Sequence, residues 1–348
     1  MTNAPLTIRT LTDGGQPAAE VAGWIAAFID GARTTLDLAQ YDFHLEGEAR
    51  EIVTGAIVGA AARGVTIRFA YNVDHRNPIP VPPPPEPDVQ LIATLPVERK
   101  AVAGVPDLMH HKYVVRDRAS VWTGSMNWTD DSFTRQENVL VAVDAPAVAA
   151  AFAQDFEQLW SRDEVEDTGV VEPTWHDGVR AWFTPGHGED LSHRIANAIG
   201  RARRRVRICS PVITTAPVLG TLAQVIAEER LDVAGCVDRT QIGGVVHQWR
   251  QNGNVSWKLP LLERVMAGPF TGKISTAWRP EGSLHDFMHA KVTIADDSVF
   301  VGSFNLSRSG EMNAENVLEI ADAAVADELA AFVDRVRALY PPVSLERA

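Results

Sequence analysis

The chain has 348 residues, 45% of them hydrophobic and 22% charged, and its formal net charge is −13. This length allows one large domain or two of ordinary size, and the composition excludes a largely disordered chain. The negative charge disfavours a protein that binds long nucleic-acid duplexes nonspecifically, because such proteins present positive surfaces to the phosphates, although a local basic cleft can sit on an acidic protein.

The sequence has no uninterrupted apolar run long enough to cross a bilayer. Residues 1–7 lack the basic stretch and apolar core of a secretory signal, so we expect a soluble, cytoplasmic protein unless a signal has been removed. Cys209 and Cys236 lie in apolar segments typical of strands. Buried free thiols are a better interpretation than a disulfide, and the number and spacing of the cysteines do not suggest zinc, so we expect no metal and no other cofactor.

The first half alternates between helical and extended patterns. Apolar residues at helical spacing predict a helix over 18–32, and alternation predicts a strand over 35–41. A second helix over 48–63, capped by Gly64, precedes a strand over 65–71 that ends near Asp74. The proline-rich segment 76–87 favours an extended, stiff conformation, and it either borders the mouth of a site or serves as a surface spacer.

A polar motif follows this segment and consists of His110-x-Lys112-x4-Asp117 and then Gly124-Ser125-x-Asn127. Residues 109–115 alternate like a strand, which places His110 and Lys112 on one face and His111 on the other, where we expect a packing or surface role. A turn at 116–120 leads to a second strand at 121–123. Gly124 and Ser125 then bring the backbone close to whatever His110 and Lys112 face.

The acidic, weakly periodic stretch 161–172 predicts a boundary between two domains, residues 1–165 and 173–348. After 179–183 opens the second half, the patterns predict a helix over 191–203, a strand over 206–210, a helix over 218–229 and a strand over 231–237 that ends near Asp238. Alternating strands and helices indicate an α/β sheet in each half. The basic run 201–205 ends a helix, where solvated cations complement the helix dipole, and a track for a phosphate backbone is the alternative.

The second half repeats the motif as His289-x-Lys291-x4-Asp296 and then Gly302-Ser303-x-Asn305. Its turn is one residue shorter, and Asp297 competes with Asp296 as the match of Asp117. Ten residues after Asn127 comes Glu137-Asn138-Val139-Leu140, and ten residues after Asn305 comes Glu315-Asn316-Val317-Leu318. This matched spacing indicates an internal duplication.

Each copy of the motif supplies an imidazole, an ammonium and an amide, a set suited to one phosphate group. A phosphodiester anion repels nucleophiles, so its reaction needs cations and hydrogen-bond donors, here the lysines and asparagines of the motifs with Ser125 and Ser303 beside them. One imidazole can attack phosphorus while the other protonates the leaving oxygen. Two copies therefore predict one imidazole for each side of a phosphodiester.

The doubled motif resembles that of the phospholipase D superfamily, and the shared plan of helices and strands extends the resemblance over nearly the whole chain. It implies an α/β fold of two repeats, each a mixed sheet flanked by helices, packed about a pseudo-twofold axis with both motifs at one site. It also implies a two-step displacement through a phosphohistidine, with His110 as nucleophile and His289 as acid. By the same resemblance, Glu137 and Glu315 hydrogen-bond the far side of each imidazole.

We therefore expect a metal-independent phosphodiesterase that hydrolyses the phosphatidyl group of a phospholipid or transfers it to an alcohol. The acidic chain and the presence of two motifs in one chain favour lipid. A nuclease that cuts single-stranded or short nucleic acid is the alternative, and a non-catalytic phosphate-binding module ranks third. A transient contact with a membrane surface is expected, and one chain suffices to complete the site.

Other residues near the motifs receive secondary roles. Asp117 and Asp296 are expected to hold turns rather than to contact the substrate. Trp128, next to Asn127, is a candidate for the substrate pocket. Trp249, Trp257 and Trp278 could line an acyl or base pocket, although core packing is the better interpretation for at least two of them.

Overall fold

The structure, a computed structural model, describes residues 2, 4–74, 87–162, 164–253, 256–277 and 284–344. The proline-rich segment 76–87, apart from Pro87, and Trp278 lie outside the described residues. The roles expected for them stay predictions.

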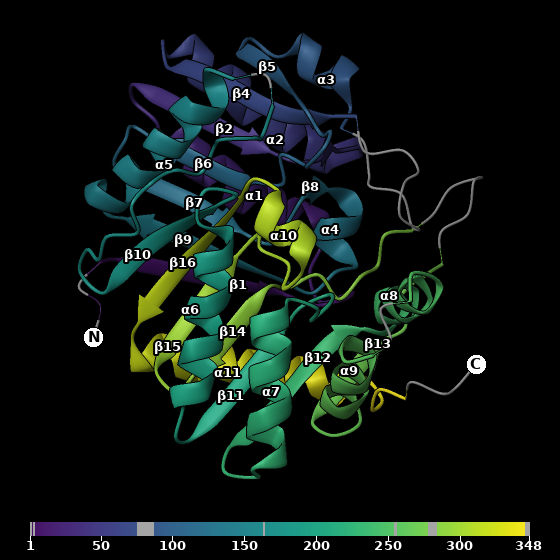
Figure 1. Ribbon diagram of the computed structural model, residues 1–348. Coiled ribbons are helices and arrows are strands. Elements are labelled where there is room, and N and C mark those ends of the chain that lie inside the picture. Colours follow the sequence, from purple (N-terminus) through teal and green to yellow (C-terminus); the bar gives the residue numbers. More distant parts are fainter. Residues whose placement is uncertain are drawn as a thin grey trace.

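The described residues of the first half form these elements (Figure 1): β1 (Leu6–Leu11), α1 (Ala18–Asp30), β2 (Thr35–Gln40), β3 (Phe43–His44), α2 (Gly47–Ala62), β4 (Thr66–Val73), α3 (Val89–Thr94), β5 (Glu98–Ala103), β6 (Lys112–Arg116), β7 (Ser120–Gly124), β8 (Trp128–Thr129), α4 (Asp130–Thr134), β9 (Asn138–Asp144) and α5 (Pro146–Trp160). The second half contributes β10 (Val179–Thr184), α6 (Gly188–Arg201), β11 (Arg205–Cys209), α7 (Ala216–Ala227), β12 (Asp232–Asp238), α8 (Arg239–Gln251), α9 (Lys258–Met266), β13 (Phe270–Lys273), β14 (Val292–Ala295), β15 (Ser298–Gly302), α10 (Arg308–Met312), β16 (Glu315–Ala321) and α11 (Ala323–Leu339).

Each half forms one seven-stranded mixed sheet, and the two sheets have the same strand order. The order is β1-β9-β7-β6-β2-β4-β5 in the first half and β10-β16-β15-β14-β11-β12-β13 in the second. Strands β2, β4 and β5 run parallel, as do β11, β12 and β13, and the other neighbours are antiparallel. This correspondence confirms the predicted fold of two α/β repeats.

The helices form where apolar residues recur on one face. In α1, for example, Val21, Ile25, Phe28 and Ile29 are buried. The helix and strand bounds predicted for both halves agree with the structure to within three residues, apart from the strands of the two motifs. Cys209 and Cys236 pair across β11 and β12 and are buried and free.

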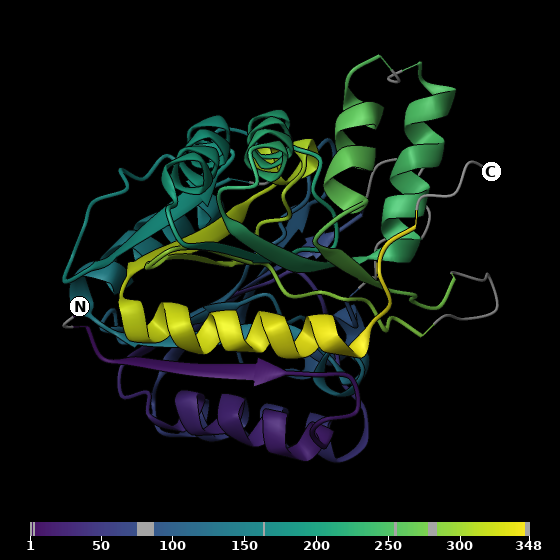
Figure 2. The same ribbon diagram turned by 90° about the horizontal axis from the view of Figure 1, so that it is seen from below.

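The two sheets and their helices stack in five layers. In Figure 2, α1 lies at the bottom in purple and α11 lies between the sheets in yellow. Helices α1 and α2 cover the outer face of the first sheet, and α6 and α7 cover the outer face of the second. Helices α5 and α11 lie between the sheets, and their apolar residues share one core with the inner faces of both. This shared core holds the halves together.

The two motif histidines precede their strands instead of lying within them. Strand β6 begins at Lys112 and β14 at Val292, both later than the sequence predicts. The preceding residues leave their own sheet and bond to the other half: the N–H of His110 donates to the carbonyl of Ala314 (2.9 Å), and that of His289 donates to the carbonyl of Glu137 (3.2 Å). The histidines are therefore held at the junction of the halves.

The second half carries an addition, the helical pair α8 and α9 between β12 and β13. Figure 2 shows this pair projecting beyond the rest of the second half. Trp249 of α8 packs into the core of that half, whereas Trp257, before α9, is 47% exposed. None of the helices within the described ranges is long and apolar enough to cross a membrane.

Candidate active site

The lysines of both motifs fold back onto their histidines at the junction of the halves. Nζ of Lys112 donates to the carbonyl of His110 (2.7 Å), and Nζ of Lys291 donates to the carbonyl of His289 (2.8 Å). All four side chains are buried, with at most 8% of each exposed. The structure thus places two imidazoles and two ammonium groups together at one site.

Burial is the largest influence on the charges of this cluster. It lowers the pKa of His110 and of His289 well below the ordinary value, and the nearby lysine ammonium groups lower both further. Burial also lowers the pKa of Lys112 to about 7 and that of Lys291 well below its usual range, against the opposing effect of Glu315. Without a ligand the site favours neutral imidazoles, and an arriving anion would favour charged lysines.

Glu315 reaches the first imidazole from the opposite half of the chain. Its Oε2 lies 2.8 Å from Nδ1 of His110, and its side chain is fully buried. Burial raises the pKa of this carboxyl to about 8, and the Lys112 ammonium opposes the rise. A partner on Nδ1 orients the ring and leaves Nε2 as the reacting nitrogen, so the contact expected for Glu315 is present.

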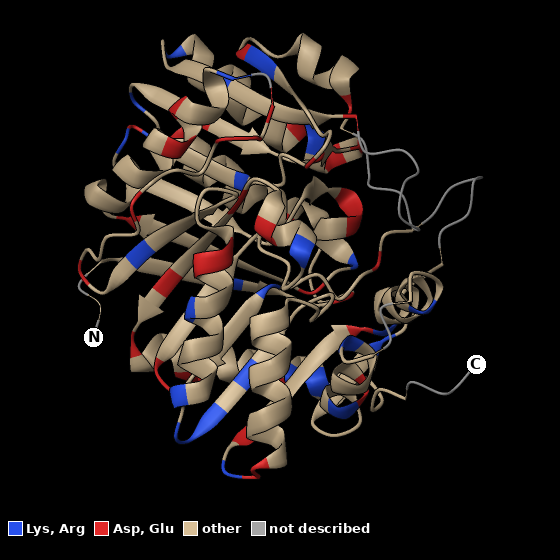
Figure 3. Cartoon of the chain, in the orientation of Figure 1, with Lys and Arg blue, Asp and Glu red and all other residues tan. Residues whose placement is uncertain are grey.

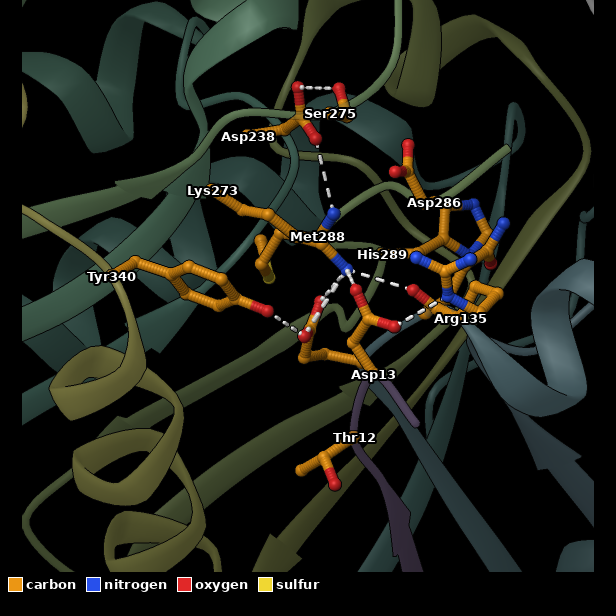
Figure 4. Close-up of polar contacts among 12 residues, drawn as sticks. Thr12, Asp13, Arg135, Asp238, Lys273, Ser275, Asp286, Met288, His289 and Tyr340 are labelled. Carbon is orange, nitrogen blue, oxygen red and sulfur yellow. Dashed lines mark hydrogen bonds and ion pairs between the residues drawn. The ribbon is translucent and has the colours of Figure 1, made fainter. Parts of the chain in front are cut away.

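A different residue takes the place expected for Glu137. Nδ1 of His289 lies 3.2 Å from Oδ1 of Asn138. The Glu137 carboxylate instead accepts hydrogen bonds from Nζ of Lys273, at 3.1 and 3.3 Å, and from the hydroxyl of Tyr340. Figure 4 shows Lys273 and Tyr340 directed toward the same carboxylate. The second imidazole is therefore supported by an amide where the sequence predicts a carboxylate.

The motif serines support the strands that carry these histidine partners. Oγ of Ser125 donates to Oδ1 of Asn138 (2.7 Å) and accepts from the N–H of Val139 (3.0 Å). Oγ of Ser303 accepts from the N–H of Asn316 (3.0 Å). Both serines are fully buried, and these hydroxyl contacts support the strands. Their expected contact with phosphate stays a prediction.

The motif asparagines are better placed for a ligand. Oδ1 of Asn127 and Oδ1 of Asn305 are both buried without a hydrogen-bond partner. Buried polar atoms normally have partners, so the unpaired amide oxygen in each half could accept a hydrogen bond from an entering donor, whereas a phosphate oxygen would need the Nδ2 donor of the same amide. Their role in phosphate binding stays a prediction.

The motif aspartates hold matching loops in the two halves. Asp117 accepts hydrogen bonds from the backbone N–H groups of residues 33–35, and Asp296 accepts from those of residues 203–205. Asp296 rather than Asp297 is therefore the counterpart of Asp117. In the basic run, Arg204 pairs with Asp297, which favours the structural interpretation of that run.

Two other candidate residues are part of the packing. Trp128 is only 1% exposed and packs beside Phe43 in the core, so it does not line a pocket as the sequence predicts. The reason is that residues after Asn127 form β8, which pairs with β3 beneath the site. His111 is fully buried between Asp155 and Asn316, and burial lowers its pKa to about 3, in keeping with its place on the face opposite His110.

Sequence reasoning did not single out Tyr41 and Asp42, which border the first motif. The ring centroids of Tyr41 and His110 are 4.6 Å apart, and Nζ of Lys112 lies 4.7 Å from the Tyr41 ring centroid. Asp42 is buried, and burial raises its pKa to about 8 against the effect of Lys112. Their position directly after β2 was the available signal, because ligands often bind at the carboxyl ends of parallel strands.

Over the described part of the chain, no group of three or more His, Cys, Asp or Glu side chains could hold a metal ion.

Comparison with known proteins identifies relatives of both halves. A family model described as cardiolipin synthase, PLD-like domain, matches residues 25–160 and 195–337. Mitochondrial cardiolipin hydrolase of Xenopus laevis is 43% identical over 53 residues, which cover 15% of this chain and 25% of that protein. Phospholipase D of Rickettsia bellii (strain RML369-C) is 29% identical over 130 residues, which cover 37% of this chain and 59% of that protein. Each alignment spans less than two thirds of the relative.

Solved structures share the fold at low sequence identity. Phosphatidylserine synthase from Haemophilus influenzae Rd KW20 matches with a TM-score of 0.64 and 13% identity, covering 96% of this chain and 88% of that chain. Polyphosphate kinase from Porphyromonas gingivalis matches with a TM-score of 0.57 and 11% identity, covering 95% of this chain and 50% of that chain. Since the family model covers most of both halves, the chain belongs to the phospholipase D superfamily, in the family described as cardiolipin synthase, PLD-like domain.

Proposed function

We propose that this protein is a metal-independent phospholipase D-type enzyme that hydrolyses the phosphatidyl group of a phospholipid or transfers it to an alcohol. The observation that carries the proposal is the pair of buried imidazoles, each with a partner on Nδ1, beside two buried lysines. This arrangement suits a phosphodiester because the lysines neutralise its oxygens while the two imidazoles act on opposite sides of phosphorus.

The reaction proceeds in two displacements. His289 takes up a proton as the substrate anion binds. Nε2 of the neutral His110 then attacks phosphorus, the bond from phosphorus to the leaving oxygen breaks, and that oxygen takes the proton from Nε2 of His289. Water or an alcohol then attacks the phosphohistidine and gives its proton to His289 as the bond between nitrogen and phosphorus breaks. Hydrolysis thus converts the diester and water into a phosphate monoester and a free alcohol, and both histidines return to their starting states.

Lipid is favoured over nucleic acid by the charge of the chain and by its relatives. The chain carries a formal net charge of −13, and Figure 3 shows Lys and Arg residues interspersed with Asp and Glu residues along both halves. Related proteins include a cardiolipin hydrolase, a phospholipase D and a phosphatidylserine synthase. A nuclease is the second candidate, because the same histidines and lysines could cleave a nucleic-acid diester.

Parallel assays of two substrates test the proposal. One measures release of the headgroup from phospholipid vesicles, and the other measures cleavage of labelled single-stranded oligonucleotides, each with and without a chelator. We expect lipid turnover that the chelator does not change, and His110→Ala should lower it by ~1000-fold or more. Acid-labile phosphate should be trapped on His110.

Each other outcome has a definite meaning. Cleavage of oligonucleotides without lipid turnover would replace the first candidate by the nuclease. Trapping of phosphate on His289 would reverse the roles of the histidines. Full activity in both His110→Ala and His289→Ala would reject the site itself.

A further inference from the structure

The two repeats differ by one residue in the register of their last strand. The spacing from the motif glycine to the downstream Leu is the same in both, so Gly124 corresponds to Gly302 and Leu140 to Leu318. Gly124 pairs with Leu140 across β7 and β9, but Gly302 pairs with Val317 across β15 and β16. Strand β9 is therefore shifted by one residue relative to β16.

This shift changes which side chain meets each imidazole. Successive residues of a strand point to opposite faces, so a shift of one residue exchanges neighbours. In the second half, the register of β15 with β16 places Glu315 beside His110. In the first half, the register of β7 with β9 places Asn138, the residue after Glu137, beside His289. The two imidazoles consequently have different chemical partners, a carboxyl group for His110 and an amide for His289.

The contacts of Asn138 determine which end of its amide faces the imidazole. Nδ2 of Asn138 lies 3.2 Å from the backbone carbonyl of Ser132, which can only accept a hydrogen bond. Oδ1 therefore faces Nδ1 of His289 (3.2 Å) and also accepts from Oγ of Ser125 (2.7 Å). Because an amide oxygen is an acceptor, the hydrogen of the neutral imidazole lies on Nδ1.

Glu137 is held in the shifted position by a buried cluster of charges. The side chain of Lys273 is 4% exposed, and its Nζ lies 3.1 Å from Oε2 of Glu137 and 3.1 Å from Oδ2 of Asp13. It also donates to the carbonyl of Arg135 (2.8 Å). Figure 4 shows Lys273, Asp13 and Arg135 gathered beside Met288 and His289. Rotating Glu137 toward His289 would take from this buried ammonium the fully buried one of its two carboxylates and leave only Asp13, which is costly.

We propose that Asn138 is the positioning residue of His289 and that its neutral amide makes this imidazole the ready proton donor of the pair. The proposal rests on the proposed function. With the hydrogen of the neutral ring on Nδ1, Nε2 of His289 carries a proton only in the imidazolium form, which a bound phosphodiester anion favours. A carboxylate on Nδ1 would stabilise that positive ring, whereas an amide stabilises it less, so the imidazolium gives up its Nε2 proton more readily to the leaving oxygen. Glu315 instead stabilises the positive ring that forms when Nε2 of His110 bonds to phosphorus.

The positioning is tested first without any substrate. Nitrogen-15 NMR of the histidines in the whole protein should show His289 with its hydrogen on Nδ1 and a pKa below the ordinary value. Asn138→Asp should raise the pKa of His289 by about one unit or more, because it adds a charge of opposite sign at hydrogen-bond distance. An unchanged titration of His289 in Asn138→Asp would overturn the proposal.

Two lipids that differ only in the leaving group test the role in catalysis. Phosphatidyl-4-nitrophenol releases an anion that needs no proton, whereas phosphatidylcholine releases an alkoxide that does. Asn138→Leu should slow the choline ester by ~100-fold or more and the nitrophenyl ester by less than ~10-fold, because loss of an effective general acid matters only for the poor leaving group. Asn138→Asp should restore part of the rate for the choline ester.

Matched variants separate this role from a general loss of structure. Asn316 corresponds to Asn138 in the sequence of the second repeat, but because of the shift its Oδ1 lies near Nδ1 of His111 (3.4 Å). Asn316→Leu should therefore leave the ratio of the two rates unchanged. If Glu137→Gln changes that ratio and Asn138→Leu does not, Glu137 is the partner of His289 and the proposal is overturned. If wild type cleaves neither lipid while the NMR result holds, the proposed function fails and the positioning by Asn138 stands.

Discussion

Two buried ammonium groups govern how the site meets a phosphate. Lys112 and Lys291 are buried together, and each lowers the pKa of the histidines beside them. Burial brings the pKa of Lys112 to about 7, so near neutral pH this lysine is only partly charged when the site holds no anion. An anion that binds here restores the charge, and binding is accordingly coupled to uptake of a proton.

This coupling predicts a pH dependence of anion binding. A bound anion raises the pKa of Lys112. The affinity for the anion is therefore highest below the pKa that Lys112 has without a ligand, about 7, and falls as the pH rises above that value. The loss should approach about tenfold for each pH unit while one proton is taken up. Competitive inhibition by diethyl phosphate, a monoanion over this range, measures it. Lys112→Met should bind more weakly and depend less on pH, because Lys291 is then the one motif lysine left to take up a proton, and an equal slope in the variant would contradict the assignment.

At the scale of single elements, the pairing of β15 with β16 decides where Glu315 lies. A Cβ on Gly302 would come within 2.1 Å of the carbonyl oxygen of Asn316, and a Cβ on Gly124 would come within 2.2 Å of that of Val139. Because the two glycines have no side chain, β16 and β9 can pack closely against β15 and β7, and this packing positions Glu315 and Asn138 beside the histidines. Glycine is needed at both positions for this reason, in addition to the positive φ of 153° at Gly124.

Gly302→Ala is therefore expected to separate β15 from β16. The clash with backbone atoms should lower the free energy of unfolding by about 1–3 kcal/mol and reduce activity, because Glu315 moves with β16. Gly55→Ala in α2 is the matched control: its added Cβ meets nothing within 4 Å, so it should stabilise the protein by about 0.5–1 kcal/mol. Urea unfolding measures both, and equal stability of the two variants would contradict this account.

Across the whole molecule, the two halves share both the site and the central core. Glu315 supports the histidine of the first half, and Asn138 supports that of the second. Helices α5 and α11 bury their apolar faces in the same core between the sheets. Neither half keeps its inner face covered or its histidine supported without the other, so the halves should unfold together.

Cooperative unfolding can be measured with a change in one half and a probe in the other. Ile57 is fully buried in α2, and Ile57→Ala should lower the free energy of unfolding by about 2–5 kcal/mol. Cys209 and Cys236 are buried in the second half, so their reaction with a thiol reagent reports its unfolding. We expect their exposure to shift to lower urea together with the circular dichroism. Thiols that keep the wild-type midpoint would show that the halves unfold separately.

Sequence by itself determined the doubled motif, the α/β repeats and the choice of His110 and Lys112 over His111, because these depend on spacing and periodicity along the chain. It also proposed Glu137 and Glu315 as partners of the imidazoles, whereas the structure decided that Glu315 meets His110 of the opposite half. Only the tertiary structure decided that Asn138 and not Glu137 contacts His289. It also decided that the hydroxyls of Ser125 and Ser303 bond to the neighbouring strand and that Trp128 packs in the core. These outcomes depend on the register between strands and on which residues of the other half lie opposite. Identical local spacing in two repeats does not encode a shift of one residue between strands, and the buried Lys273 that holds Glu137 away comes from the other half of the chain.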